Sequence, residues 1–261
     1  MTTQIERLLA IMARLRDPER GCPWDRAQSW STIVPHTLEE AHELADAVAE
    51  GDPQRIRDEL GDVLFQVVFQ ARIAEEGGHF RFEDVAATIS DKLERRHPHV
   101  FGNETIVDQA ALRQAWERHK ASERAAAGSG AGALDGIART LPALARSEKL
   151  GKRAARVGFD WPDLAGVLAK VREEIAELES AAQANDPAHL REELGDLLFS
   201  LAQVARRLDL DAEDALRAAN AKFERRFRHV EAALQARGLQ PSDVGLDELE
   251  ALWAAAKRAL G

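Results

Sequence analysis

The phrase RDELGDVLFQVV at residues 57–68 returns as REELGDLLFSLA at residues 191–202, 134 positions further along the chain. Seven of the twelve positions are identical, and they include the acids and the glycine of the ELGD core. Apolar residues recur three and four positions apart, as at Leu60, Leu64 and Val67, which predicts a helix rather than a strand. A phrase repeated at this length predicts a repeated helical module.

The similarity extends outwards on both sides of this phrase. The matching stretches are TLEEAHEL at 37–44 with VREEIAEL at 171–178, and EDVAATISDKLERRHPHV at 83–100 with EDALRAANAKFERRFRHV at 213–230. Each half therefore carries two acidic clusters followed by a basic cluster. We predict an N-terminal module at residues 1–120 and a C-terminal module at 137–261, joined by a flexible glycine-, alanine- and serine-rich linker at 121–136.

Helix signals recur throughout the chain, whereas strand signals are absent and there is no tyrosine. Thr37-Leu38-Glu39-Glu40 reads as a capping box, which predicts a helix that begins near Leu38. Asp52-Pro53 and Asp186-Pro187 each place an N-cap before a first-turn proline, so the next helices begin there. Further helices are expected at 83–96, 212–236 and 246–260. The predicted fold is all-α, with tandem duplicated helical-bundle modules.

Composition excludes several classes of partner. The 261 residues carry a formal net charge of −10, which disfavours nucleic acid and anionic membranes. Cys22 is the single cysteine, so no internal disulfide forms, as is typical of the reducing cytosol. The N-terminus has no apolar stretch of signal-peptide length, and the longest apolar runs, at 63–71 and 197–205, are too short to cross a bilayer. We expect a cytoplasmic protein with neither a nucleic-acid nor a membrane partner.

Acidic residues lie on shared helix faces in both halves. Glu40 and Glu43 are three positions apart, as are Glu59 and Asp62 on the following helix. Antiparallel packing of two such helices brings the four carboxylates together. The second half repeats the pattern with Glu174, Glu177, Glu193 and Asp196. Solvated surface acids are the alternative for any one cluster taken alone.

Gly61 and Gly195 lie between these acids in mid-helix, where glycine costs about 1 kcal/mol relative to alanine. The cost indicates close approach of a backbone or a ligand, although a packing requirement explains it equally well. Converging carboxylates repel one another unless they are protonated or bridged by cations. A site built from oxygens alone favours Mg²⁺, with Mn²⁺ as a substitute.

A di-iron site is the competing metal hypothesis. Glu39-x-x-His42 and Glu94-x-x-His97 follow the paired spacing of di-iron carboxylate proteins. The second half has Ala176 and Phe227 in place of the two histidines, while its acids persist. The di-iron hypothesis is therefore the weaker one.

Basic residues follow the acids in both halves, and we interpret them as phosphate ligands. The two sets are Lys92, Arg95 and Arg96, and Lys222, Arg225 and Arg226. Alone, each set reads as a salt-bridged helix surface. Together with the acids, they fit phosphate oxygens held between a metal and cationic side chains. Trp24, Trp161 and Trp253 offer stacking surfaces for a base, although core packing is the commoner role of any single tryptophan.

In combination, these motifs resemble a known family. EExxE, ELGDxLF and K-x-x-R-R are similar to the all-α nucleoside triphosphate pyrophosphohydrolases, and the tandem copy with CPWDRAQSW, SDKLERRHPHVF and RVGFDW resembles the MazG family. The resemblance covers nearly the whole chain outside the linker. It implies Mg²⁺-dependent hydrolysis of nucleoside triphosphates, NTP or dNTP, to the monophosphate and pyrophosphate, in a homodimer of helical modules.

The resemblance also implies roles for residues of the C-terminal module, which is generally the active one in the family. Metal ligands would be Glu174, Glu177, Glu193 and Asp196. Substrate-binding residues would be Lys170, Arg172, Arg191, Lys222, Arg226 and Trp253. Among these, Lys222 and Arg226 would stabilise charge on the phosphates. A further residue, Glu173, is the candidate for positioning the attacking water. A second set of acids matches at Glu40, Glu43, Glu59 and Asp62, where His36 replaces Lys170.

Two other functions stay open from the sequence. The chain could be a nucleotide-binding regulator with slow turnover, or a pyrophosphohydrolase of another nucleotide such as phosphoribosyl-ATP. Homodimerisation is expected in any of these cases, because the helices carry more apolar surface than one partner helix buries. That surface is formed by Val63, Leu64, Val67 and Val68 in one half and by Leu197, Leu198 and Leu201 in the other.

Overall fold

The computed structural model describes residues 3–103, 108, 112 and 132–261. The chain divides into two compact units, residues 1–119 and 120–261. In the described part of the chain every regular element is a helix and no strand occurs, which confirms the all-α prediction. None of the described helices is long and apolar enough to cross a membrane.

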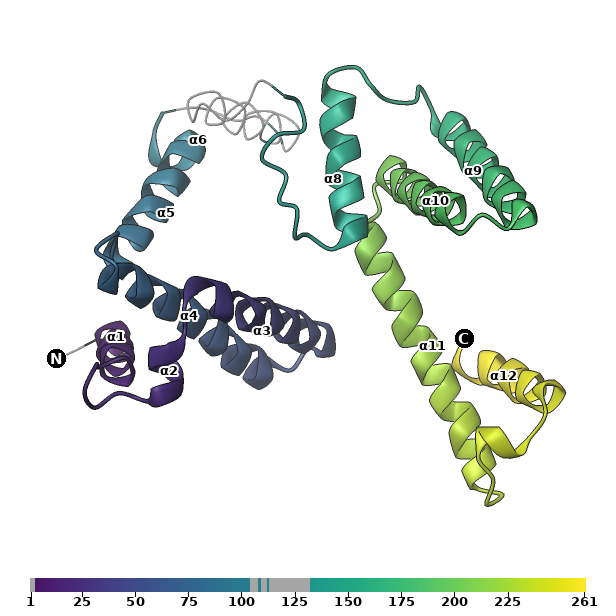
Figure 1. The fold of residues 1–261 in the computed structure, drawn as a ribbon, viewed down its shortest axis with the longest axis horizontal. Helices are drawn as coiled ribbons and strands as arrows, with labels where there is room; N and C mark the ends of the chain where they lie inside the picture. Colours follow the sequence, from purple (N-terminus) through teal and green to yellow (C-terminus); the bar gives the residue numbers. More distant parts are fainter. Residues whose placement is uncertain (1–2, 104–107, 109–111, 113–131) are drawn as a thin grey trace. The chain divides into compact units, whose positions relative to one another are not determined.

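Each unit is built around a pair of long helices packed side by side (Figure 1). The N-terminal unit contains α1 (Gln4–Leu15), α2 (Pro23–Ala27), α3 (Trp30–Glu50), α4 (Pro53–Glu76), α5 (Phe82–Arg96) and α6 (Pro98–Phe101). The C-terminal unit contains α8 (Ala143–Arg156), α9 (Leu164–Ala184), α10 (Pro187–Arg207), α11 (Ala212–Gln235), a 3₁₀ turn (Pro241–Asp243) and α12 (Leu246–Leu260). The long pairs are α3 with α4 and α9 with α10.

The predicted N-caps of the second helix of each pair are confirmed. The Asp52 carboxylate accepts a hydrogen bond from the backbone N–H of Gln54, and α4 begins at Pro53. The Asp186 carboxylate does the same for two backbone N–H groups at the start of α10. Helices α5, α11 and α12 also lie where the sequence predicts them. Residues 121–131 of the predicted linker lie outside the described residues, and the module boundaries stay a prediction.

The predicted start of α3 is wrong by two turns. The helix begins at Trp30, where the hydroxyls of Ser29 and Thr32 cap each other's backbone N–H groups. Thr37 lies inside the helix instead, and its hydroxyl donates to the carbonyl of Ile33, 3.2 Å away. Pro35 is accommodated within α3 and does not end it. The capping box at Ser29 therefore prevails over the weaker signal at Thr37.

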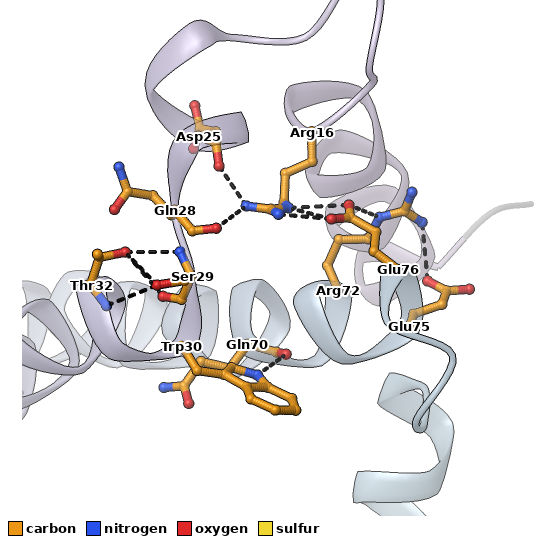
Figure 2. Close-up of polar contacts among 10 residues, drawn as sticks. All are labelled: Arg16, Asp25, Gln28, Ser29, Trp30, Thr32, Gln70, Arg72, Glu75 and Glu76. Atoms are coloured by element: carbon orange, nitrogen blue, oxygen red, sulfur yellow. Dashed lines mark hydrogen bonds and ion pairs between the residues drawn. The ribbon is translucent and has the colours of Figure 1, made fainter.

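A buried arginine ties the N-terminal helices together (Figure 2). Arg16, at the C-terminal end of α1, has a side chain only 7% exposed, and it donates from Nε and Nη2 to the carboxylate of Glu76 at the end of α4. Its Nη1 donates to the backbone carbonyls of Asp25 and Gln28 around α2. The guanidinium also lies 5.4 Å from the centre of the Phe69 ring. One side chain thus connects α1, α2 and α4 over a core of Met12, Ile33, Val68 and Phe69.

The C-terminal unit uses a buried amide in a comparable place. Gln203 of α10 is fully buried, and its carboxamide donates to the carbonyl of Ser147 in α8. The same carboxamide accepts from Arg206, whose guanidinium pairs with Asp160 in the segment before α9. Gly151 of α8 lies so close that an added Cβ would overlap the Gln203 amide. A polar network therefore joins α8, α10 and the 157–163 segment.

We expect Arg16→Ala to destabilise the N-terminal unit by about 2–3 kcal/mol, because it removes several hydrogen bonds to a charged group and leaves the part-buried Glu76 carboxylate with Arg72 as its remaining arginine partner. Hydrogen exchange of the α1 and α4 amides, read by mass spectrometry, measures the effect in this unit alone. Arg14→Ala, at an exposed position of the same helix, is the matched control and should leave exchange unchanged. Equal exchange in the two variants would contradict the role assigned to Arg16.

The same contact predicts a pH dependence. Burial alone would raise the pKa of Glu76, but hydrogen bonds and charge from Arg16 and Arg72 outweigh it, and the pKa is lowered. A carboxyl with a lowered folded-state pKa stabilises the fold above its unfolded value of about 4.3 and loses that contribution as the pH falls further. The difference between the wild type and Arg16→Ala should therefore shrink in acid.

Candidate functional site

The acids predicted on the helix pairs converge in both units. Carboxylate oxygens of Glu40, Glu43 and Glu59 lie within 4.8 Å of one another, and we refer to these residues as the N-terminal acid group. Oxygens of Glu174, Glu177 and Glu193 lie equally close and form the C-terminal acid group. In each group, two acids one turn apart on the first long helix face one acid of the second helix. Helical spacing and the packing of the pair are sufficient to bring them together.

The fourth predicted ligand of each set stands apart. Asp62 and Asp196 are not among the acids that share the 4.8 Å spacing. Asp62 is nevertheless close enough for its charge to act on Glu40. Three of the four predicted metal ligands are thus brought together in each unit, and the roles of Asp62 and Asp196 stay predictions.

The N-terminal acid group is poorly neutralised. Burial raises the pKa of Glu40, and the negative charges of Asp62, Glu43 and Glu59 raise it further, while a hydrogen bond with Gln66 opposes them. Arg55 lies 3.7 Å from the Glu59 carboxylate, and it pairs more closely with Glu50.

The C-terminal acid group has closer nitrogen-bearing partners. The Lys170 ammonium lies 2.6 Å from an oxygen of Glu173 and 2.8 Å from an oxygen of Glu174. These two contacts raise the pKa of Lys170 well above its usual value. His189 Nε2 lies 2.7 Å from the Glu193 carboxylate. The sequence contains a signal for both contacts. Lys170 and His189 each stand four positions before an acid that they contact, which is the spacing of neighbours on one helix face.

The residues present fit a hard divalent cation. Oxygens bound to Mg²⁺ at about 2.1 Å lie roughly 3 to 4 Å apart, so small side-chain movements suffice to enclose an ion. The donors are all carboxylates, as Mg²⁺ and Mn²⁺ prefer. Within the described residues, the Glu39–His42 and Glu94–His97 pairs form no metal-holding group, so the di-iron hypothesis gains no support.

The glycines beside the acids are not explained by packing within the chain. Among the residues that the structure describes, a Cβ added to Gly61 or Gly195 would meet no atom within 4 Å outside the helix's own backbone. The sequence left open a packing requirement or an approaching ligand, and the first of these is wrong within one copy of the chain. Leu194, Leu198 and Leu201 flank Gly195 on α10, and about half of each side chain is exposed.

The predicted phosphate ligands do not meet the acids within the C-terminal unit. Figure 1 shows α11 extending away from the α9–α10 pair, with α12 packed along its far half. Arg226 on α11 donates to the backbone carbonyl of Gly261, and Trp253 on α12 packs against Phe223 with ring centres 5.1 Å apart. No ion pair links Lys222 or Arg226 to the acid group among the residues that the structure describes.

The remaining predicted substrate residues lie on the long helix pair. Arg172 and Arg191 are exposed, each two positions before an acid of the C-terminal group. Trp161 packs against Gly166 in the first turn of α9. Trp24 lies edge-on to His36 and Phe69, so packing accounts for its position.

Together, these features define an all-α protein in which two related helix pairs each carry a carboxylate site suited to a divalent cation. The family model of the MazG nucleotide pyrophosphohydrolase domain matches residues 28–101 and 164–231. These two matches contain both acid groups. The chain belongs to the MazG family.

Several relatives share most of this chain. A nucleoside triphosphate pyrophosphohydrolase of Escherichia coli K12 is 52% identical over 257 residues, which are 98% of this chain and 97% of the relative. A Thermotoga maritima protein named nucleoside triphosphate pyrophosphohydrolase/pyrophosphatase MazG is 42% identical over 97% of this chain and 95% of its own. A Mycolicibacterium smegmatis nucleoside triphosphate pyrophosphohydrolase is 35% identical over 92% of this chain and 63% of its own.

The repulsion at Glu40 predicts a gain of stability when its charge is removed. When the folded-state pKa of a carboxyl is raised, stability is lost as the pH rises from the unfolded-state pKa to the folded-state pKa. The penalty is complete above the folded-state pKa and absent in acid, where the group is protonated in both states. Glu40→Gln should therefore stabilise the metal-free N-terminal unit by up to about 1 kcal/mol at pH 7. The gain should vanish near pH 4.

Thermal unfolding in the presence of a chelator measures this gain. Glu39→Gln is the control, because Glu39 is exposed and lies outside the acid group. A lower melting temperature for Glu40→Gln at pH 7 would show that Glu40 supports the fold rather than strains it.

Proposed function

We propose that this protein is a cytoplasmic enzyme that hydrolyses nucleoside triphosphates to the monophosphate and pyrophosphate, with Mg²⁺ as its cofactor and Mn²⁺ as a substitute. The observation that carries the proposal is the convergence of Glu174, Glu177 and Glu193 within 4.8 Å in a MazG domain. The names of its relatives support the same substrate class.

The acid group supplies the metal side of the site. Glu174, Glu177 and Glu193 would hold the cation, with Asp196 as the fourth ligand. When bound, the cation would neutralise the triphosphate and polarise its α-phosphorus. Without that neutralisation, carboxylates and triphosphate would repel each other.

Other side chains bind substrate and move the proton. Glu173, which projects beside Glu174 and contacts Lys170, would orient a water molecule and accept its proton as the water attacks the α-phosphorus. Lys222 and Arg226 would bind the departing pyrophosphate oxygens. Lys170, Arg172 and Arg191 would contact the remaining phosphates, and Trp253 would stack on the base.

A homodimer would complete this site. Because α11 extends away from the acids of its own unit, we propose that a second copy brings Lys222, Arg226 and Trp253 to them. The exposed leucines of α10 and the open glycine between them support helix packing at this face. Glycine lets a neighbouring backbone approach closely, which accounts for its cost in the helix.

Pyrophosphate release over a panel of NTPs, dNTPs and phosphoribosyl-ATP tests the function. We expect release from nucleoside triphosphates, loss of release in excess EDTA, and recovery with Mg²⁺. Tight NTP binding with negligible release would identify a regulator instead. Release from phosphoribosyl-ATP alone would identify the other pyrophosphohydrolase class.

The two acid groups should not contribute equally. The C-terminal group has Lys170 2.8 Å from Glu174, whereas the N-terminal group has His36 in that place, 3.5 Å from Glu39. We expect Glu193→Ala to remove most NTP hydrolysis, by at least about a hundredfold in kcat/KM, since a metal ligand is lost. Glu59→Ala, the matched substitution in the other unit, should retain most activity. The reverse ranking would place catalysis in the N-terminal module.

The proposed dimer gives a separate prediction. Leu198→Glu puts a charge into the exposed stripe of α10 and should shift the protein from dimer to monomer in light scattering, because the interface would bury an unpaired carboxylate. Leu246→Glu, at the exposed start of α12, is the matched control and should remain dimeric. A monomeric wild type of about 29 kDa at micromolar concentration would refute the dimer.

A further inference from the structure

A lysine ammonium lies where the C-terminal acid group would otherwise be unneutralised. Lys170 stands one turn before Glu173 and Glu174 on α9, and it contacts both carboxylates at 2.6 and 2.8 Å. The Glu174 side chain is only 4% exposed, so water screens this contact poorly, although the Lys170 side chain is 35% exposed. The ammonium therefore pairs directly with a carboxylate that the divalent cation would need as a ligand.

The N-terminal acid group has the same helical geometry without this lysine. His36 occupies the equivalent position, three residues before Glu39 and four before Glu40. Its imidazole reaches Glu39 at 3.5 Å, and no ion pair to Glu40 is found in the described residues. Carboxylate oxygens of Glu43 and Glu59 lie within 4.8 Å of a Glu40 oxygen, so Glu40 experiences their repulsion without a lysine in the place of Lys170. The two units thus offer a natural comparison of an acid group with a lysine beside its first-helix acids and one with a histidine in that place.

We propose that Lys170 is an internal counter-ion that competes with the divalent cation for Glu174 until a triphosphate draws the ammonium away. This inference rests on the proposed function. Its consequence is that the C-terminal group binds a divalent cation weakly on its own and more tightly together with a nucleotide. In the N-terminal group His36 stands in place of the lysine, so Glu40 binds the cation without that competitor, although Arg55 lies 3.7 Å from Glu59.

The same carboxylates can be neutralised in two ways, by the Lys170 ammonium or by a divalent cation. Three carboxylates within 4.8 Å repel one another, and either an ammonium or a divalent ion relieves the repulsion. Both cannot lie against the same oxygen, because they repel each other. Lysine suits an exchange of this kind, since its flexible stem can carry the charge from the carboxylate to a nearby phosphate oxygen.

Calorimetric titration of Mn²⁺ into nucleotide-free protein tests the competition directly. The full-length chain carries Glu40→Gln and Glu59→Gln, so that the C-terminal group is measured alone. We expect Lys170→Gln to bind Mn²⁺ roughly fivefold more tightly than the parent, as for loss of one partly screened ion pair. Lys149→Gln, which removes the same charge from an exposed position of α8, should leave the affinity unchanged.

Equal or weaker binding in Lys170→Gln would overturn the inference while leaving the metal site intact. Absence of Mn²⁺ binding in both proteins would remove the metal site and the inference together, so the two failures are distinguishable. A mirror experiment adds the missing lysine to the other unit. In a chain with Glu174→Gln and Glu193→Gln, His36→Lys should weaken Mn²⁺ binding several-fold, and unchanged binding there would also count against the competition.

Discussion

Repulsion among carboxylates held at close range is the constraint on which the site depends. Packing of the long helices forces three acids to within 4.8 Å in each unit, whether or not a cation is there. The two units differ in how closely this charge is paired: Lys170 and His189 lie 2.8 and 2.7 Å from C-terminal acids, whereas Arg55 lies 3.7 Å from Glu59. In the N-terminal unit, burial and the neighbouring acids raise the pKa of Glu40. One repeated scaffold therefore holds two sites with different electrostatics, which is the physical basis for expecting different tasks.

The predictions from the sequence were correct for features that depend on interactions within about one helical turn. The N-caps Asp52 and Asp186 act within one turn, so the starts of α4 and α10 were correctly placed. The convergence of acids needs only helical spacing and one packed neighbour, and it was correct for three of the four acids in each unit. At α3, two capping signals compete within eight residues around Pro35, and sequence alone does not rank them. The direction of α11 depends on long-range packing, so the separation of its basic residues from the acids could not be predicted.

The supporting contacts have diverged more than the acids they hold in place. Phe69 and Gln203 stand at equivalent positions of α4 and α10, and both are fully buried. Around Phe69 the core is apolar, and Arg16 closes it by pairing with Glu76. Around Gln203 the contacts are hydrogen bonds, and Arg206 closes them by pairing with Asp160. Different interactions thus hold two helix pairs in a geometry that brings the same acids together.

The glycines at 61 and 195 extend this argument beyond a single copy of the chain. Each costs its helix about 1 kcal/mol relative to alanine, and neither is required by a neighbouring atom in the described part of its own chain. Because this destabilisation occurs beside both acid groups, we expect a contact that requires glycine, and the described part of one copy does not supply it. Close approach of a second helix over the exposed leucines of α10 would supply it, and would bring a second α11 within reach of the acids. The features that one copy leaves unexplained, the open glycines and the distant basic residues, thus have the same physical solution.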